Sequence, residues 1–201
     1  MSEHYYTEKP ASDIKEKEFS ETIKRKTLSF LSVSGVFAFG DRIDKVSHLL
    51  VENFIPSGKS FLDVGCGYGA IGLFCKALHP QLFVTMTDIN ERAIAYSAKN
   101  AKRNNLYVKV LKSDLYAELK ADLFWDIVTN PPISAGKDVV TRLIQESKAH
   151  LHPGGALWLA AFHNKGGSTF KKIMEECFGN AEDVVKKGGI RVYKSVAFAN
   201  Q

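Results

Sequence analysis

A glycine-rich segment between an apolar run and an amphipathic stretch is the strongest chemical signal in the sequence. It reads Phe61-Leu-Asp-Val-Gly-Cys-Gly-Tyr-Gly-Ala-Ile-Gly72, which predicts a strand that runs into a turn and then into a helix. Gly65, Gly67 and Gly69 let the backbone lie against a ligand where a Cβ would intrude. Asp88 follows about 20 residues later, at the end of the next predicted strand, where a carboxylate can accept hydrogen bonds from both ribose hydroxyls. Together these residues predict a site for an adenosine cofactor.

Two further carboxylates bear on which cofactor this is. The spacing Gly67-Tyr-Gly69-Ala-Ile-Gly72 matches the dinucleotide fingerprint G-x-G-x-x-G, so NAD is one candidate. Asp63, two residues before the first glycine, would repel a pyrophosphate but would stabilise a cationic methionine ammonium. Asp114, just after the predicted strand that ends at Leu111, is placed to meet the adenine edge. This acidic rim favours S-adenosylmethionine over NAD.

The motif Asn130-Pro131-Pro132-Ile133 follows a predicted strand over 124–129. Asn-Pro at the end of a strand is also ordinary turn chemistry. Here two prolines fix the backbone, so the Asn130 side-chain oxygen and the Pro131 carbonyl can accept the two hydrogens of an exocyclic amine and leave its lone pair aimed at a methyl group. Asn cannot act as a general base at neutral pH, and methyl transfer to an amine needs mainly alignment. The motif therefore predicts an amino-group target.

The elements that must position these residues alternate along the chain. Strands are expected over 61–64, 82–87, 107–111, 124–129 and 156–162, and helices over 43–54, 71–78, 90–104, 137–151 and 168–178. Asp41 is the expected N-cap of the first helix. This order predicts an α/β fold, a doubly wound, mostly parallel sheet with helices on both faces. Gly188 and Gly189 predict a C-terminal β-hairpin, which adds one antiparallel strand.

Composition and charge exclude several classes of protein. The chain has 201 residues, 45% apolar and 24% charged, as ordinary globular domains do. It has neither an apolar run long enough to cross a bilayer nor a secretion signal in its first ten residues, so a soluble cytoplasmic protein is expected. The spacing of the three cysteines and six histidines predicts neither a disulfide framework nor a metal site. The net charge of +5, with Lys24, Arg25 and Lys26 in a row, permits an anionic partner.

On these motifs the sequence resembles the class I S-adenosylmethionine-dependent methyltransferases, and within them the ribosomal RNA small-subunit guanine-N2 methyltransferase group, the small methyltransferase domain. The segments that carry the resemblance are Leu31-Ser-Val-Ser-Gly-Val-Phe37, Arg42-Ile-Asp44, Leu62-Asp-Val-Gly-Cys-Gly-Tyr-Gly69, Thr87-Asp-Ile-Asn90, Asn130-Pro-Pro-Ile133 and Gly189-Ile-Arg-Val-Tyr-Lys194. It implies a Rossmann-like methyltransferase domain over 36–201. The residues themselves predict what precedes it: a polar, charged and loosely held arm of about 18 residues, and one or two short strands over 19–33 that form a small β extension within 1–35.

The resemblance also implies which residues form the site. Those around the cofactor are Asp63, Gly65, Cys66, Gly67, Gly69, Asp88, Ile89, Asp114, Leu115, Asn130 and Phe37. Those at the target amine are Asn130, Pro131, Pro132 and Ile133, and Val36 and Phe37 fold over the site. The implied substrate is a guanine of ribosomal RNA, free or in a ribosomal subunit, flipped into the cleft.

Ribosomal RNA as a partner gives weight to the basic residues. Lys24, Arg25 and Lys26 become candidate RNA contacts beside Phe37, because phosphate contacts dominate affinity for nucleic acids. Larger ribosomal members of the group also carry a second, non-catalytic copy of the domain, for which 201 residues leave no room. Positioning of the substrate is therefore expected from the arm, the basic residues or a second subunit, and the chain is expected to act as a monomer or a homodimer.

The chain departs from the family at Ile133, where an aromatic residue often stacks on the target base. Stacking is then expected from Phe37 or Phe162. Three alternative functions stay open: methylation of a protein glutamine amide, which uses a similar motif, an NAD-dependent oxidoreductase, and a cofactor-binding regulator without catalysis.

Overall fold

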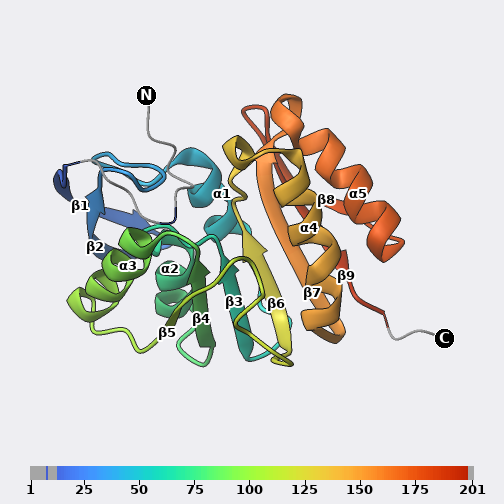
Figure 1. Ribbon diagram of the computed structural model, residues 1–201, viewed down its shortest axis with the longest axis horizontal. Helices are drawn as coiled ribbons and strands as arrows, with labels where there is room; N and C mark the ends of the chain where they lie inside the picture. Colours follow the sequence, from blue (N-terminus) through green and yellow to red (C-terminus); the bar gives the residue numbers. More distant parts are fainter. Residues whose placement is uncertain (1–7, 9–12, 199–201) are drawn as a thin grey trace.

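A seven-stranded sheet forms the middle layer of the molecule (Figure 1). The structure is a computed structural model that describes residue 8 and residues 13–198. Its strands are β3 (Ser60–Val64), β4 (Phe83–Asp88), β5 (Lys109–Lys112), β6 (Phe124–Thr129), β7 (Leu151–Phe162), β8 (Glu182–Lys187) and β9 (Ile190–Val196). They lie in the order β5-β4-β3-β6-β7-β9-β8, and β9 alone runs against the others. The predicted doubly wound sheet with one antiparallel strand is confirmed.

Helices cover both faces of this sheet, as the alternation predicts. α1 (Lys45–Asn53), α2 (Ala70–Leu78) and α3 (Glu91–Arg103) share one buried apolar cluster, whereas α4 (Lys137–Ser147) and α5 (Ser168–Phe178) share the other. Figure 1 shows α2 and α3 on one side of the strands and α4 and α5 on the opposite side. Short helical turns complete the chain at η1 (Ile133–Ala135), η2 (Lys148–His150) and η3 (His163–Gly167).

The N-terminal β extension is a hairpin of β1 (Glu16–Ile23) and β2 (Lys26–Val33) that packs on the main fold. The Phe30 ring lies 5.7 Å from the Phe74 ring of α2, and the Asn100 side chain of α3 bonds both the N–H and the carbonyl of Leu31. The hairpin therefore shares the core of the domain. Because β1 begins at Glu16, the predicted arm is shorter than about 18 residues, and most of it falls on 1–7 and 9–12, which lie outside the described residues.

The first helix begins later than predicted, so Asp41 as its N-cap is wrong. The cap is Asp44, whose Oδ1 accepts hydrogen bonds from the N–H groups of Val46 and Ser47, each at 3.0 Å. Ile43 is buried just before this cap and extends the helical spacing of apolar residues, which led the prediction one turn too far. Asp41 is exposed and pairs with its neighbour Arg42.

The order of the strands creates a crevice at one edge of the sheet. From β3 the chain moves outward through β4 to β5, and it then returns to β6 and moves outward on the other side. The loops after β3 and β6 therefore diverge, and ligands of such sheets bind where this happens, outside the carboxyl ends of the strands. Gly65, Asp88, Ser113 and Asn130 end or follow the four strands β3 to β6, so the topology gathers the predicted site residues at this crevice.

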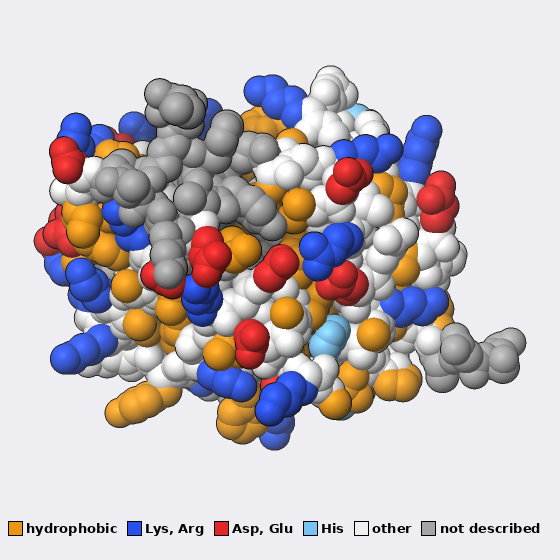
Figure 2. All heavy atoms as spheres, in the orientation of Figure 1, with side chains coloured by type: hydrophobic (Ala, Val, Ile, Leu, Met, Phe, Trp, Pro, Cys, Tyr) orange, Lys and Arg blue, Asp and Glu red, His pale blue; other side chains and the backbone are white. Residues whose placement is uncertain are grey.

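Charged side chains of both signs are interspersed on the face of the molecule drawn in Figure 2, rather than gathered into one basic patch. Within the described part of the chain, no helix is long and apolar enough to cross a bilayer.

Candidate active site

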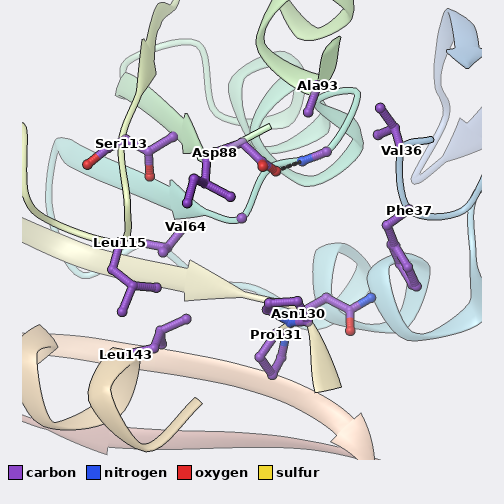
Figure 3. Close-up of a pocket in the computed structure, with 15 residues that line it drawn as sticks. Val36, Phe37, Val64, Asp88, Ala93, Ser113, Leu115, Asn130, Pro131 and Leu143 are labelled. Atoms are coloured by element: carbon purple, nitrogen blue, oxygen red, sulfur yellow. Dashed lines mark hydrogen bonds between the residues drawn. The ribbon is translucent and has the colours of Figure 1, made fainter. Parts of the chain in front are cut away.

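A cleft that is partly open to solvent lies at the carboxyl ends of β3 to β6 (Figure 3). It is lined by Val36, Phe37, Val64, Gly65, Gly67, Thr87, Asp88, Ile89, Ala93, Ser113, Leu115, Asn130, Pro131, Pro132 and Leu143. In Figure 3, Leu115 and Leu143 lie at one end of the cleft, and Asn130 and Phe37 lie at the other. Its mostly apolar lining with a few polar groups is typical of sites for small ligands.

The glycine loop forms a cradle on the floor of the cleft. The N–H groups of Gly65 and Cys66 both donate to the Thr87 carbonyl at 2.9 Å, which holds the loop against β4. Gly65 and Gly67 have φ values of 73° and 57°, in the region that favours glycine. A Cβ on Gly67 would stand 3.7 Å from Val36 Cγ1, and one on Gly65 would stand 3.9 Å from Pro132 Cδ. Both added atoms would occupy space between residues that line the cleft, where a ligand can approach the bare backbone.

Asp88 ends β4 and is the single ionisable side chain among the described residues that line the cleft. Its Oδ2 accepts from the Gly67 N–H and its Oδ1 accepts from the Asn90 N–H, both at 2.9 Å. Burial raises the pKa of the Asp88 carboxyl, and these backbone N–H groups oppose that shift. Each carboxylate oxygen keeps a further lone pair, so Asp88 can accept hydrogen bonds from two ribose hydroxyls.

Asp63 does not reach the cleft, although the sequence predicts it there. Successive side chains of a strand point to opposite faces, and Val64 takes the face that lines the cleft. The Asp63 carboxyl is buried toward α2, where Oδ2 accepts from the Gly72 N–H at 2.9 Å and Oδ1 has no hydrogen-bond partner among the described residues. Burial raises its pKa to about 7, against the effect of the Gly72 hydrogen bond, and the charge of Asp88 adds to the rise.

Asp114 is also directed away from the cleft. Its neighbours Ser113 and Leu115 line the cleft, while the exposed Asp114 carboxylate lies 3.9 Å from Arg142 of α4. Neither acidic side chain that separated S-adenosylmethionine from NAD on the sequence therefore enters the cleft.

Three other predicted residues lie near the cleft without lining it. Cys66 is buried in the glycine loop, and Gly69 is the N-cap of α2 with a φ of 95°. Burial raises the pKa of the Cys66 thiol well above its ordinary value. Ile133 belongs to η1 and is 38% exposed. The structure thus brings Gly65, Gly67, Asp88, Ile89, Leu115, Asn130, Pro131, Pro132 and Phe37 together from the predicted set.

The Asn-Pro-Pro motif carries two acceptors at the edge of the cleft. The Pro131 carbonyl accepts a hydrogen bond from the Ile133 N–H at 2.8 Å, which leaves one of its two lone pairs for a ligand. The Asn130 amide nitrogen Nδ2 donates to Asp44 Oδ1 at 3.1 Å and to Ser47 Oγ at 3.0 Å. No residue in the described part of the chain donates to Asn130 Oδ1, so this oxygen is the remaining acceptor of the amide. The sequence analysis did not single out Asp44 or Ser47 for this contact.

The segment with Val36 and Phe37 is tied to the start of α3. The Asn90 side chain caps α3 by accepting from the Arg92 and Ala93 N–H groups, and its Nδ2 donates to the Gly35 carbonyl at 2.8 Å. Arg92 Nη1 donates to the Ser34 carbonyl at 2.7 Å. The sequence analysis did not predict that Asn90 or Arg92 serves the site. The position of Asn90 as a helix cap was the sequence feature that could have indicated it.

The predicted RNA contacts Lys24, Arg25 and Lys26 lie far from the cleft. They form and follow the tight turn between β1 and β2, where Lys24 and Arg25 have positive φ. β2 has 8 residues and separates this turn from Val33 by about 23 Å. The turn lies toward the C-terminal end of α2, which His79 caps. Burial lowers the pKa of His79, and the nearby charge of Lys24 lowers it further.

The fold and the cleft define a class I methyltransferase, and comparison with known proteins agrees. Residues 27–194 match the family model of the methyltransferase small domain, so the chain belongs to this family. S-adenosylmethionine is its cofactor, and the cleft fits it: glycine backbone for close approach and Asp88 for the ribose. The family match, rather than the lining of the cleft, separates this cofactor from NAD.

Individual relatives show which members of the family the chain resembles. The chain is 38% identical over 201 residues to the "Uncharacterized protein YbxB" of Bacillus subtilis, covering 97% of this chain and 98% of that protein. It is 32% identical over 184 residues to ribosomal RNA small subunit methyltransferase C of Aliivibrio salmonicida, covering 89% of this chain and 52% of the relative. The chain thus spans about half the length of the curated ribosomal RNA methyltransferases that it matches.

A solved structure agrees with these sequence matches. It is the Thermus thermophilus 16S rRNA N2 G1207 methyltransferase in complex with AdoMet and guanosine. It superposes with a TM-score of 0.80 at 26% identity, over 93% of this chain and 52% of that one.

Proposed function

We propose that the protein transfers the methyl group of S-adenosylmethionine to the exocyclic amino group of a guanine in ribosomal RNA, and that it works in the cytoplasm on RNA or on a ribosomal subunit. The observation that carries the proposal is the Asn-Pro-Pro motif at the mouth of the cofactor cleft, with the Oδ1 of Asn130 available as an acceptor. The similarity to a 16S rRNA N2 guanine methyltransferase supports guanine as the base.

Alignment by this motif accounts for the chemistry. S-adenosylmethionine supplies an electrophilic methyl group on a sulfonium centre. Asn130 Oδ1 and the Pro131 carbonyl can each accept one hydrogen of the target amine, which directs the nitrogen lone pair toward that methyl. Asn130 does not remove a proton, because an amide has no basicity at neutral pH. As the N–C bond forms and the bond from the methyl group to sulfur breaks, the surplus proton of the amine therefore passes to solvent. Orientation of this kind can contribute about 7–11 kcal/mol, far more than a single net hydrogen bond of about 1 kcal/mol.

Phe37 is the aromatic side chain we propose to stack on the base in place of the usual aromatic at position 133. It is 38% exposed and lines the cleft beside Asn130. Phe162, the other candidate, lines a separate groove. Stacking of one base on an aromatic side chain is worth about 1–3 kcal/mol.

That groove is where we propose the RNA backbone approaches. It is lined by Ile43, Lys45, His48, Leu49, Glu52, Phe162, Lys187, Gly188 and Ile190. The first turn of α1 separates it from the cleft, since Asp44 and Ser47 bond Asn130 while Lys45 and His48 line the groove. No described carboxylate lies within 4.0 Å of the Lys45 or Lys187 ammonium, so both charges can meet phosphates. The Lys24 to Lys26 turn remains a proposed second contact for a large substrate.

Transfer of labelled methyl tests the proposal. The acceptors are ribosomal RNA, small ribosomal subunits that lack the modification, and ribosomal proteins. Asn130→Ala is expected to reduce transfer to RNA by about 100-fold or more while calorimetric affinity for S-adenosylmethionine stays within about threefold. Asn53→Ala is the matched control, because among the described residues the Asn53 amide bonds the Leu49 carbonyl alone, within α1.

Two outcomes would overturn the proposal. Label found in protein and not in RNA would establish the glutamine-amide alternative. Unchanged transfer by Asn130→Ala would remove the motif from the reaction.

A further inference from the structure

We infer that Asp44 and Ser47 are positioning residues that hold the Asn130 amide in the single orientation that accepts an amine. The inference rests on the proposed function and extends it to the specificity of the site. It assigns to the start of α1 a role that the glycine loop and the Asn-Pro-Pro motif do not fill.

Both hydrogens of the Asn130 amide nitrogen are engaged by this helix. Nδ2 lies 3.1 Å from Asp44 Oδ1 and 3.0 Å from Ser47 Oγ. The same Asp44 oxygen caps α1, since it accepts from the N–H groups of Val46 and Ser47. Val46 and Ser47 are buried, so the cap is fixed by the core, and the cap in turn fixes the amide.

The chemistry of Asp44 determines which end of the amide faces it. An ionised carboxylate only accepts hydrogen bonds, so the NH₂ end of Asn130 must point toward Asp44 and the oxygen must point away. A flipped amide would set Asn130 Oδ1 against the Asp44 carboxylate, which would lose the hydrogen bond from Nδ2. The Ser47 hydroxyl can donate or accept, so Asp44 is the group that determines the orientation. With both N–H groups used, Oδ1 is the polar atom that remains for a ligand.

An acceptor held in this way discriminates among groups on a base. It can bind an amino group, which has two hydrogens to donate, but it repels a carbonyl oxygen or an unprotonated ring nitrogen. If the amide could rotate freely, it would present a donor as readily as an acceptor and lose that selection. The orientation of Asn130 thus contributes to the choice of an amine as the methyl acceptor.

Asp44→Asn tests the orientation with little effect on the helix. Asn caps helices as well as Asp does, so α1 keeps its cap, but an Asn at 44 can present either an oxygen or an NH₂ group to Asn130. We expect kcat for RNA methylation to fall by about ten- to hundredfold, with the Kd for S-adenosylmethionine and the melting temperature close to those of the wild type. Ser47→Ala is expected to act in the same direction with a smaller effect.

Asp41→Asn is the matched control. It is the same chemical change three residues earlier, at an exposed side chain that pairs with its neighbour Arg42 and with no other described residue. Its kcat and cofactor Kd are expected to stay within about twofold of the wild type.

Nuclear magnetic resonance gives a readout that needs no methyl acceptor. The side-chain ¹H–¹⁵N pair of Asn130 can be assigned by its loss in Asn130→Ala. We expect this pair to shift and to exchange faster with solvent in Asp44→Asn and Ser47→Ala, and to stay in place in Asp41→Asn.

The outcomes separate this inference from the proposed function. If the wild type transfers no methyl to RNA, the proposed function fails, and an unmoved Asn130 amide pair in Asp44→Asn would overturn the inference independently. A moved pair with unchanged kcat would remove its role in catalysis. A weakened cofactor Kd with unchanged kcat would show that Asp44 serves the cofactor and would overturn the inference as well.

Discussion

Gly67 meets the cofactor cleft with a backbone conformation that a side chain would strain, and Gly188 offers a matched comparison. Both have a φ of 57°, but an added Cβ at Gly67 would lie 3.7 Å from Val36 Cγ1, whereas nothing lies within 4 Å of one at Gly188. Substitution by Ala should lower the free energy of unfolding by about 1–2 kcal/mol at either position. Only Gly67→Ala should also weaken S-adenosylmethionine binding, by about tenfold or more, as measured by calorimetry.

The opposite result for this pair is easy to recognise. Equal cofactor affinity in Gly67→Ala and Gly188→Ala would mean that the loop does not lie against the cofactor.

Asp63 remains a proposed cofactor residue although its carboxyl lies behind the glycine loop. Its pKa of about 7 stands above the ordinary value for Asp, so the group is neutral at low pH and becomes ionised as the pH passes about 7. A cation in the cleft favours the ionised form. Affinity for S-adenosylmethionine should therefore rise with pH through about 7 in the wild type, and Asp63→Asn should flatten that rise.

Calorimetric titrations from about pH 5.5 to about pH 8.5 measure this difference. Parallel profiles for the wild type and Asp63→Asn would leave Asp63 with a purely structural role.

The site residues that could be predicted from the sequence are those whose residue type allows few roles at that position. Gly65, Gly67 and Asp88 stand at the ends of strands, where a bare backbone or a carboxylate has few other purposes. The contact of Asn130 with Asp44 joins residues 86 positions apart, and nothing local marks it. The sequence prediction put Asp63 in the cleft because of its charge alone. The alternation of side chains along β3 directs it to the opposite face of the sheet.

At the scale of elements, the predicted helix boundaries are correct where a residue in the sequence marks the end of the helix. α3 lies within the predicted helix over 90–104, and α5 ends at Phe178 as predicted, before Gly179, whose φ is 75°. The predicted helix over 137–151 was four residues too long, since α4 ends at Ser147 and a short turn follows. Leu151 continues the helical spacing of apolar residues, yet it opens β7 and pairs with Phe124 before a register shift in the ladder.

The attachment of the Val36 and Phe37 segment to α3 can be tested at a single side chain. Asn90→Asp keeps a good N-cap, but the new carboxylate cannot donate to the Gly35 carbonyl as Asn90 Nδ2 does at 2.8 Å. We expect α3 to stay folded while residues 34–38 exchange their amide hydrogens faster. Hydrogen exchange read by mass spectrometry measures both regions in one experiment. Unchanged exchange over 34–38 would show that other contacts hold this segment.

For the whole molecule, the position of basic residues matters more than the net charge of +5. The face in Figure 2 shows interspersed charges, and two lysines, Lys45 and Lys187, line the groove beside α1. Lys45→Glu with Lys187→Glu should weaken RNA binding and reduce the slope of log affinity against log salt by about 2. Lys24→Glu with Lys26→Glu makes the same change in charge at the distant hairpin turn, and it should have the smaller effect.

Fluorescence anisotropy with a labelled ribosomal RNA fragment, repeated over several salt concentrations, distinguishes the two basic sites. A larger effect of the hairpin pair would make the β1–β2 turn the main RNA contact, against the groove. Equal effects would mean that RNA senses only the total charge. Sedimentation of the same samples measures the oligomeric state, for which a monomer or a homodimer stays the prediction.

The identity of the methylated nucleoside tests the central claim most directly. Small ribosomal subunits that lack the modification would be incubated with the protein and S-adenosylmethionine, and their RNA digested to nucleosides and analysed by mass spectrometry. The account predicts N2-methylguanosine with the wild type and with Asn53→Ala, and none with Asn130→Ala. A methyl group on another nucleoside, on a protein glutamine, or on nothing in the subunit would contradict it.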